Sequence, residues 1–145
     1  MSHVAVRRTA IAGALLTLAL SAPAQAHHGN GPARCSQAYG GTFNHFRPNY
    51  PIYSQSTGRK LGWLSLNWQA IGNGRYRTCA VVMRSHHARK RFSAVRIKPV
   101  YANRPWRRKA TRSRWGAGPV VYRGRCVKIR ARISRSSRFR AFCYA

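Results

Sequence analysis

The stretch that follows Cys126 alternates strictly between apolar and polar residues. Residues 127–134 read Val-Lys-Ile-Arg-Ala-Arg-Ile-Ser. Successive side chains of a β-strand leave the backbone on opposite faces, so a period of two predicts a half-buried strand. Its polar face carries Lys128, Arg130 and Arg132 with no acidic residue among them. The pattern therefore indicates an apolar core face beneath a positively charged surface.

Two further segments predict a β-hairpin. Residues 61–69 place Leu64, Leu66 and Trp68 on one face, and residues 76–85 place Cys79, Val81 and Met83 on one face. The segment between them, Ile-Gly-Asn-Gly-Arg at 71–75, supplies the positive φ angles that a hairpin turn requires.

The remaining strands are expected at residues 52–53, 92–100, 120–122, 125–134 and 139–144. A hairpin is predicted for residues 120–122 and 125–134, with its turn at 123–124. A basic turn is predicted at residues 134–138, and a long loop at residues 101–115. Residues 27–49, rich in Gly, Pro, Asn and His, predict an irregular arm tied down at Cys35. Several short strands separated by turn signals predict an all-β domain over residues 50–145, a small antiparallel sandwich or barrel.

Residues 1–26 have the pattern of a signal peptide. Arg7 and Arg8 precede an apolar run over residues 10–20, and Ala24-Gln25-Ala26 forms a cleavage signature. A membrane span needs about 20 apolar residues, and this run is shorter. We expect cleavage after Ala26 and release of a secreted or cell-surface-associated monomer.

The cysteines are Cys35, Cys79, Cys126 and Cys143. Export, together with the absence of a C-x-x-C pair, favours two disulfides over a zinc site. Four cysteines allow three pairings. Cys35–Cys79 with Cys126–Cys143 is favoured because each pair closes a loop that is local in sequence.

The composition is strongly one-sided, with 28 Lys and Arg residues and no Asp or Glu. A codon bias toward arginine would not by itself remove every carboxylate. The composition excludes a paired-carboxylate glycosidase, a carboxylate calcium site and a Ser-His-Asp triad. A protein with such a surface is expected to adhere to polyanions.

Five short segments of the chain form an ordered set of motifs. They are Leu-Gly-Trp-Leu-Ser-Leu-Asn at 61–67, Cys-Ala-Val-Val-Met-Arg at 79–84, Ala-Gly-Pro-Val at 117–120, Gly-Arg-Cys-Val at 124–127 and Phe-Cys at 142–143. In these segments the chain resembles the secreted actinobacterial proteins similar to spore-associated protein A, and the resemblance covers roughly residues 50–143. The resemblance implies a small secreted, disulfide-linked β-domain and brings no catalytic residues. The family tends to carry acidic or neutral residues near Arg107, Arg108 and Lys128, so this member is expected to bind something more anionic.

The segment 101–115 combines aromatic and basic residues. Tyr101, Trp106 and Trp115 are interspersed with Arg104, Arg107, Arg108, Lys109, Arg112 and Arg114. Aromatic rings stack on bases and guanidinium groups bind phosphate, a combination that suits single-stranded nucleic acid. The alternative is that Trp106 and Trp115 cap the core. The predicted polyanion-binding residues are these basic residues with Trp106, extended by Lys128, Arg130 and Arg132 on the strand.

We therefore expect a protein that binds anionic polymers, either extracellular nucleic acid or cell-envelope polymers, without catalysis, cofactor or metal. A cationic antimicrobial or membrane-active protein is one alternative, although no long amphipathic helix is evident. A second alternative is a ribonuclease that uses His86 or His87 with Lys90. The side chains of adjacent residues such as these two histidines usually point apart, which argues against it. Copper held by His27 with a further residue such as His45 is a third, and no spacing specifies that second ligand.

Overall fold

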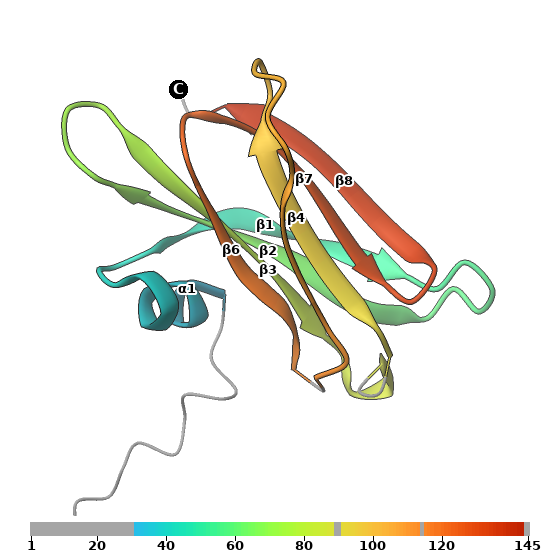
Figure 1. Ribbon diagram of the computed structural model, residues 1–145. Helices are drawn as coiled ribbons and strands as arrows, with labels where there is room; N and C mark the ends of the chain where they lie inside the picture. Colours follow the sequence, from blue (N-terminus) through green and yellow to red (C-terminus); the bar gives the residue numbers. More distant parts are fainter. Residues whose placement is uncertain (1–30, 89–90, 114, 144–145) are drawn as a thin grey trace, which may run out of the picture.

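The computed structural model describes residues 31–88, 91–113 and 115–143, and for residues 47, 48 and 87 it describes only the backbone. The first sheet, in the order β1-β2-β3-β6, contains β1 (Asn44–Tyr53), β2 (Lys60–Ala70), β3 (Tyr76–Arg84) and β6 (Gly116–Arg123). The second sheet, in the order β5-β4-β7-β8, contains β4 (Ser93–Pro99), β5 (Arg107–Thr111), β7 (Cys126–Ile133) and β8 (Ser136–Cys143). Every pairing among them is antiparallel. Figure 1 shows the second sheet lying across the first, so these residues form an open sandwich and not a closed barrel.

The core lies between the two sheets. The alternation predicted for β7 is confirmed, because Val127, Ile129, Ala131 and Ile133 are completely buried while Arg130 and Arg132 are exposed. Apolar side chains of β2, β3, β4 and β6 complete the same cluster: Leu64, Leu66, Ala80, Val82, Val95, Ile97 and Val120. Removal of this apolar surface from water is the main favourable term in folding. Burial of the apolar face of β7 leaves its polar face directed away from the core.

The predicted β2–β3 hairpin is present, with Leu66 opposite Ala80 and Ala70 opposite Tyr76. Asn73 has a φ of 52° and Gly74 a φ of 64° in its turn. The left-handed region that the Asn-Gly pair favours is therefore used here.

Residues 31–39 and 44–49 are regular, which corrects the expectation of an irregular arm over 27–49. They contain the helix α1 (Gly31–Tyr39) and most of β1, which is much longer than the strand expected from residue 52. The sequence carries weak signals of this helix. Pro32 stands in its first turn, where a missing amide hydrogen costs nothing. Gly40, at a φ of 73°, follows its last residue, where a left-handed residue commonly ends a helix.

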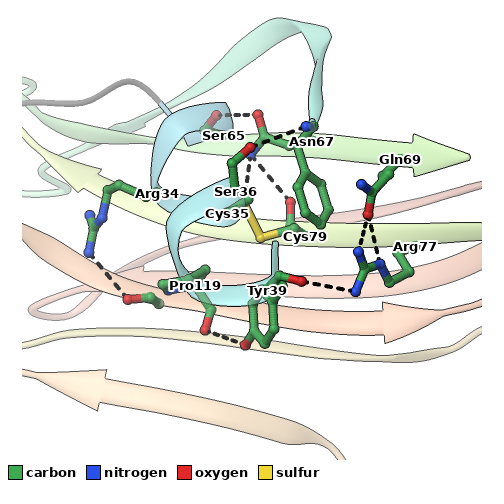
Figure 2. Close-up of a disulfide and its surroundings, with 12 residues drawn as sticks. Arg34, Cys35, Ser36, Tyr39, Ser65, Asn67, Gln69, Arg77, Cys79 and Pro119 are labelled. Carbon is green, nitrogen blue, oxygen red and sulfur yellow. Dashed lines mark hydrogen bonds between the residues drawn. A yellow bond between two sulfur atoms is a disulfide. The ribbon is translucent and has the colours of Figure 1, made fainter. Parts of the chain in front are cut away.

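Helix α1 covers the outer face of the first sheet. Cys35 is completely buried and forms a disulfide with Cys79 on β3 (Figure 2). Val81 and Phe43 are buried in the same small cluster. The face of β3 that carries Cys79, Val81 and Met83 is thus packed against the helix, while Ala80 and Val82 fill the sandwich core.

Both predicted disulfides are confirmed. The second joins Cys126 to Cys143, which are paired across β7 and β8 with Cα atoms 4.0 Å apart. The two bridges fasten different layers, because one ties α1 to the first sheet and the other joins neighbouring strands of the second.

The predicted hairpin of residues 120–134 is wrong. Only two residues separate β6 from β7, yet β6 pairs with β3 in the first sheet and β7 pairs with β4 and β8 in the second. The connection therefore crosses from one layer to the other. Pro119 lacks an amide hydrogen, which suits β6 to the edge of a sheet. The basic turn expected at 134–138 is also shorter, since β8 begins at Ser136.

The predicted loop at 101–115 contains the strand β5, which pairs with β4 and places Arg108 opposite Arg96. Its residues, Arg-Arg-Lys-Ala-Thr, are almost all exposed and show no apolar alternation. The strand forms because the edge of β4 offers unpaired backbone groups. A charged edge strand also discourages further strand addition.

Candidate anion-binding surface

The outer face of the second sheet gathers basic side chains from three neighbouring strands. We call it the basic face, and it consists of Arg96 and Lys98 of β4, Arg108 of β5, and Lys128, Arg130 and Arg132 of β7. The strand register and the period of two place them on the same side of the sheet, opposite the core. Arg108, Arg130 and Arg132 are exposed, and the other three are half-buried.

Like charges stand directly opposite one another on this face. Arg96 is paired with Arg130 on one side and Arg108 on the other, and Lys98 is paired with Lys128. Neighbouring strands lie about 4.8 Å apart, and like charges placed directly opposite across strands are destabilising. The chain contains no Asp or Glu to offset them. The countercharge must therefore come from outside the protein.

Aromatic rings border the basic face. The ring of Trp106 lies 5.4 Å from the Arg96 guanidinium and 5.2 Å from the Lys98 ammonium. Phe92 lies 6.0 Å from the Arg132 guanidinium. On β8, Phe139 is opposite Arg130 and is 46% exposed.

A shallow hollow of about 170 Å³ opens within this face, lined by Phe92, Ala94, Arg96, Arg108, Arg130 and Arg132. Four of its six lining residues are arginines, so an anionic group is the chemistry that it suits.

A larger cavity, which we call the cleft, opens beside the basic face, where α1, β3, β6 and the segment before β5 meet. Its volume is about 650 Å³, and its lining residues are Tyr39, Arg77, Arg104, Pro105, Trp106, Arg107, Val121, Tyr122 and Arg123. Trp106 belongs to both, because its ring lines the cleft and contacts Arg96 and Lys98 of the basic face.

Contacts hold two of the cleft residues in place. The Arg107 guanidinium donates a hydrogen bond of 3.2 Å to the Val121 carbonyl and lies 5.8 Å from the Tyr122 ring. The Tyr39 hydroxyl donates to the Pro119 carbonyl at 2.9 Å. Burial raises the pKa of Tyr39, and the nearby charge of Arg107 opposes that shift. The cleft therefore combines a positioned guanidinium with a neutral phenol.

Other arginines serve the fold. Arg34 of α1 donates to the carbonyls of Trp115 and Gly118, each at 3.2 Å, and fastens the helix across the first sheet. Arg77 donates through Nε to Gln69 Oε1 at 2.8 Å and through Nη1 to the Tyr39 carbonyl at the end of α1 (Figure 2). A cation at a helix C-terminus also interacts favourably with the helix dipole.

Arg84 is only 8% exposed and connects the two sheets at one end of the sandwich. It donates to Ser93 Oγ on β4 at 3.0 Å and to the carbonyls of Thr111 at 3.1 Å and Arg112 at 3.3 Å. Burial lowers the pKa of Arg84 and of Arg34, because desolvation disfavours a charged group. In a protein without acidic side chains, carbonyl and hydroxyl oxygens take the place of carboxylates around structural arginines.

The predicted binding residues fall into separate groups. Arg108, Lys128, Arg130 and Arg132 lie together on the basic face, with Trp106 at its border, whereas Arg104 and Arg107 line the cleft. Lys109 projects from the opposite side of β5 to Arg108. Arg112 lies past the end of β5, beside Arg84, and Arg114 lies outside the described residues.

The aromatic residues of the segment are also separated. Trp115 precedes β6, and its carbonyl accepts a hydrogen bond from Arg34 of the helix. Tyr101 is 84% exposed. The segment 101–115 is therefore not one continuous binding platform.

Sequence reasoning missed Arg96 and Lys98, which lie at the centre of the basic face. The signal was present, because residues 93–99 read Ser-Ala-Val-Arg-Ile-Lys-Pro and alternate with the same period as β7. It also missed Phe139 and the cleft residues Arg123, Tyr122 and Tyr39. Nothing in their local sequence indicated that these would meet.

The structure describes only some of the residues considered for catalysis or copper. His86 is exposed in the short helix η1 (His86–Ala88), while Lys90, His27 and the side chain of His87 lie outside what the structure describes. His45 Nε2 lies 2.8 Å from Asn49 Oδ1. Among the residues that the structure describes, no group of three or more His, Cys, Asp or Glu side chains is placed to hold a metal ion.

Comparisons of the chain with protein-family models, curated proteins and solved structures found no match. The resemblance to the family of spore-associated protein A therefore stays a prediction. None of the helices in the described part of the chain is long and apolar enough to cross a membrane.

Proposed function

We propose that this protein is secreted and binds phosphate-bearing anionic polymers through the basic face, without catalysing a reaction. The single observation that carries the proposal is the register that sets Arg96 opposite Arg130 and Lys98 opposite Lys128 in a chain with no acidic residue. Nucleic acid and the phosphate polymers of cell envelopes share this chemistry, and the proposal covers both.

The electrostatics of the basic face favour a role in binding, in preference to a surface that is only solvated. Like charges directly opposite one another destabilise the folded state, by roughly 0.8 kcal/mol for unit charges about 5 Å apart in water. A polyanion laid across the face supplies negative charge to several of these side chains and releases its own condensed counterions. Unfavourable pairs within the free protein thus become favourable contacts in the complex.

Secretion is supported by the signal-peptide pattern of residues 1–26 and by the two disulfides, which persist in oxidising compartments. Outside the cell the protein would meet both extracellular nucleic acid and envelope polymers. Non-specific adhesion to such polymers needs only charge and accessible surface.

The test is the salt dependence of binding to a duplex DNA of about 20 base pairs, measured by fluorescence anisotropy between about 50 and 200 mM salt. If all six side chains of the basic face engage phosphates, the logarithm of the binding constant should fall with the logarithm of salt with a slope near −5. Binding that does not change across this range would refute the proposal. Dye release from anionic vesicles would instead support the membrane-active alternative.

A matched pair of variants locates the surface. Replacing Lys128, Arg130 and Arg132 with glutamine should reduce the magnitude of the slope by about 3, because three phosphate contacts are lost. The control removes the same number of charges from Arg59, Lys60 and Arg75, which lie at or beside the turns of the first sheet. An equal loss of slope in both variants would show that charge acts without regard to position, and the basic face would lose its role.

A further inference from the structure

The cleft differs from the basic face in the chemistry of its lining. Three of its nine lining residues, Tyr39, Trp106 and Tyr122, are aromatic, and four are arginines. Its volume of about 650 Å³ falls within the range of small-molecule sites, roughly 300–1,000 Å³. A polymer that carries only phosphates gains nothing from the rings, whereas a nucleic-acid base can stack on them.

The arginines of the cleft are not equivalent. Arg77 is committed to Gln69 and to the end of α1, so it shapes the wall. Arg107 is held by the Val121 carbonyl beside the Tyr122 ring and keeps other donors for a ligand. Arg104 and Arg123 are exposed at the cleft. A phosphate can therefore meet guanidinium groups while its base lies among the rings.

Gly124 leaves room for the ring of Tyr122. A Cβ atom at residue 124 would lie 2.5 Å from Cε1 of the ring, so a larger residue there would displace the ring. The ring also packs against the core of the sandwich and lies beside the Arg107 guanidinium, and these contacts position it in the free protein. A positioned ring lowers the entropic cost of binding a flat ligand.

The cleft and the basic face are continuous through Trp106, which contacts Arg96 and Lys98 as well as lining the cleft. On the far side of the basic face, Phe139 presents an exposed ring opposite Arg130. A chain with flexible, unpaired bases can follow such a path, whereas the bases of a duplex are held within its stack.

We infer that the ligand is a single-stranded nucleic acid, and that the cleft receives one nucleotide while the backbone continues across the basic face. The base stacks against Trp106 and Tyr122, and Arg107 binds the adjoining phosphate. This inference rests on the proposed binding of phosphate polymers, and it selects nucleic acid over an envelope polymer.

The experiment compares two labelled oligomers with the same backbone charge. One is an oligothymidylate of about 15 nucleotides, near the upper end of single-stranded site sizes. The other is an abasic oligodeoxynucleotide of equal length. Affinities are measured by anisotropy at one salt concentration, and oligothymidylate should bind roughly tenfold more tightly, the gain expected from one stacked base.

Variants assign the base preference to the cleft. Trp106→Leu should reduce the preference to about onefold by removing the stacking ring while leaving the charge unchanged. Trp63→Leu is the matched control, because Trp63 lies 5.2 Å from the Lys60 ammonium just as Trp106 lies 5.2 Å from that of Lys98, yet it lines a different cavity. Tyr122→Leu, which keeps an apolar contact with the core, is the second cleft variant should Trp106→Leu fail to fold.

Each outcome decides between the two claims. Equal affinity for the two oligomers in the wild type overturns the inference and leaves the proposed function standing. A base preference that survives both cleft variants, or that Trp63→Leu also removes, overturns the assignment to the cleft. If neither oligomer binds even at low salt, the proposed function fails and the inference fails with it.

Discussion

Neutralising Arg130 should stabilise the free protein and weaken its binding. Arg130 is exposed on β7, directly opposite Arg96, with Lys128 and Arg132 two residues away on the same strand. The substitution Arg130→Gln keeps a long polar side chain and removes only the charge. Stability and affinity change in opposite directions because the positive charge of Arg130 repels its neighbours in the free protein and attracts a bound polyanion.

The size of the stability gain follows from the register. Side chains directly opposite one another have Cβ atoms about 5 Å apart, and two residues along a strand span about 7 Å. Unit charges at these distances repel by roughly 0.6–0.8 kcal/mol in water. Because long side chains splay apart, we expect a total near 1 kcal/mol at low ionic strength, or a rise in Tm of about 3–5 °C for a chain of this size.

Thermal unfolding followed by circular dichroism measures the gain. It should be largest at about 0.01 M salt and nearly absent at about 1 M, where the Debye length falls from roughly 30 to 3 Å. In the binding assay, the loss of one phosphate contact should weaken affinity roughly tenfold at low salt and reduce the slope by about 0.9. Arg59→Gln, in the exposed turn between β1 and β2, serves as the control and should change neither quantity appreciably.

A drop in Tm at low salt on replacing Arg130 would refute the reasoning, because it would mean that the opposed charges are not repelling one another. A rise in Tm with unchanged affinity would separate repulsion from function and remove Arg130 from the binding surface.

Three further predictions concern stability. Replacing Cys35 and Cys79 with alanine should lower the free energy of unfolding, measured in urea, by about 4 kcal/mol, and replacing Cys126 and Cys143 should lower it by about 3 kcal/mol. The first bridge closes the longer loop, with a sequence separation of 44 against 17, and the reverse order of the two losses would contradict the loop-closure argument. Tm should stay nearly constant between about pH 5 and 2, because acid unfolding is driven mainly by protonation of side-chain carboxylates and the chain has none; a steep loss in that window would show that another group titrates. Arg84→Gln should lower the free energy of unfolding by about 3 kcal/mol, since it leaves a buried hydroxyl and two carbonyls without their charged donor; thermal unfolding that matches the wild type would show that those groups find other partners.

The strands with buried apolar faces were predictable. The alternation around Ile129 and the Asn-Gly pair at residues 73–74 predict local geometry directly, because a period of two and a positive φ depend on only a few adjacent residues. Strand β5 was missed because its pairing depends on the backbone edge of β4 and on no side-chain pattern. The β6–β7 connection was misread because a two-residue link serves a hairpin and a crossing between sheets equally well.

The sequence alone determined that this chain forms a disulfide-linked β-domain of unbalanced positive charge, because alternation, cysteine content and composition are all local or additive properties. Only the tertiary structure decided which arginines are accessible. Register set Arg96 beside Arg130 on the outer face, whereas burial committed Arg84 to carbonyls inside the sandwich. Side chains far apart in sequence, such as Tyr39 and Tyr122, line one cleft only because α1 packs against the sheet that contains β6.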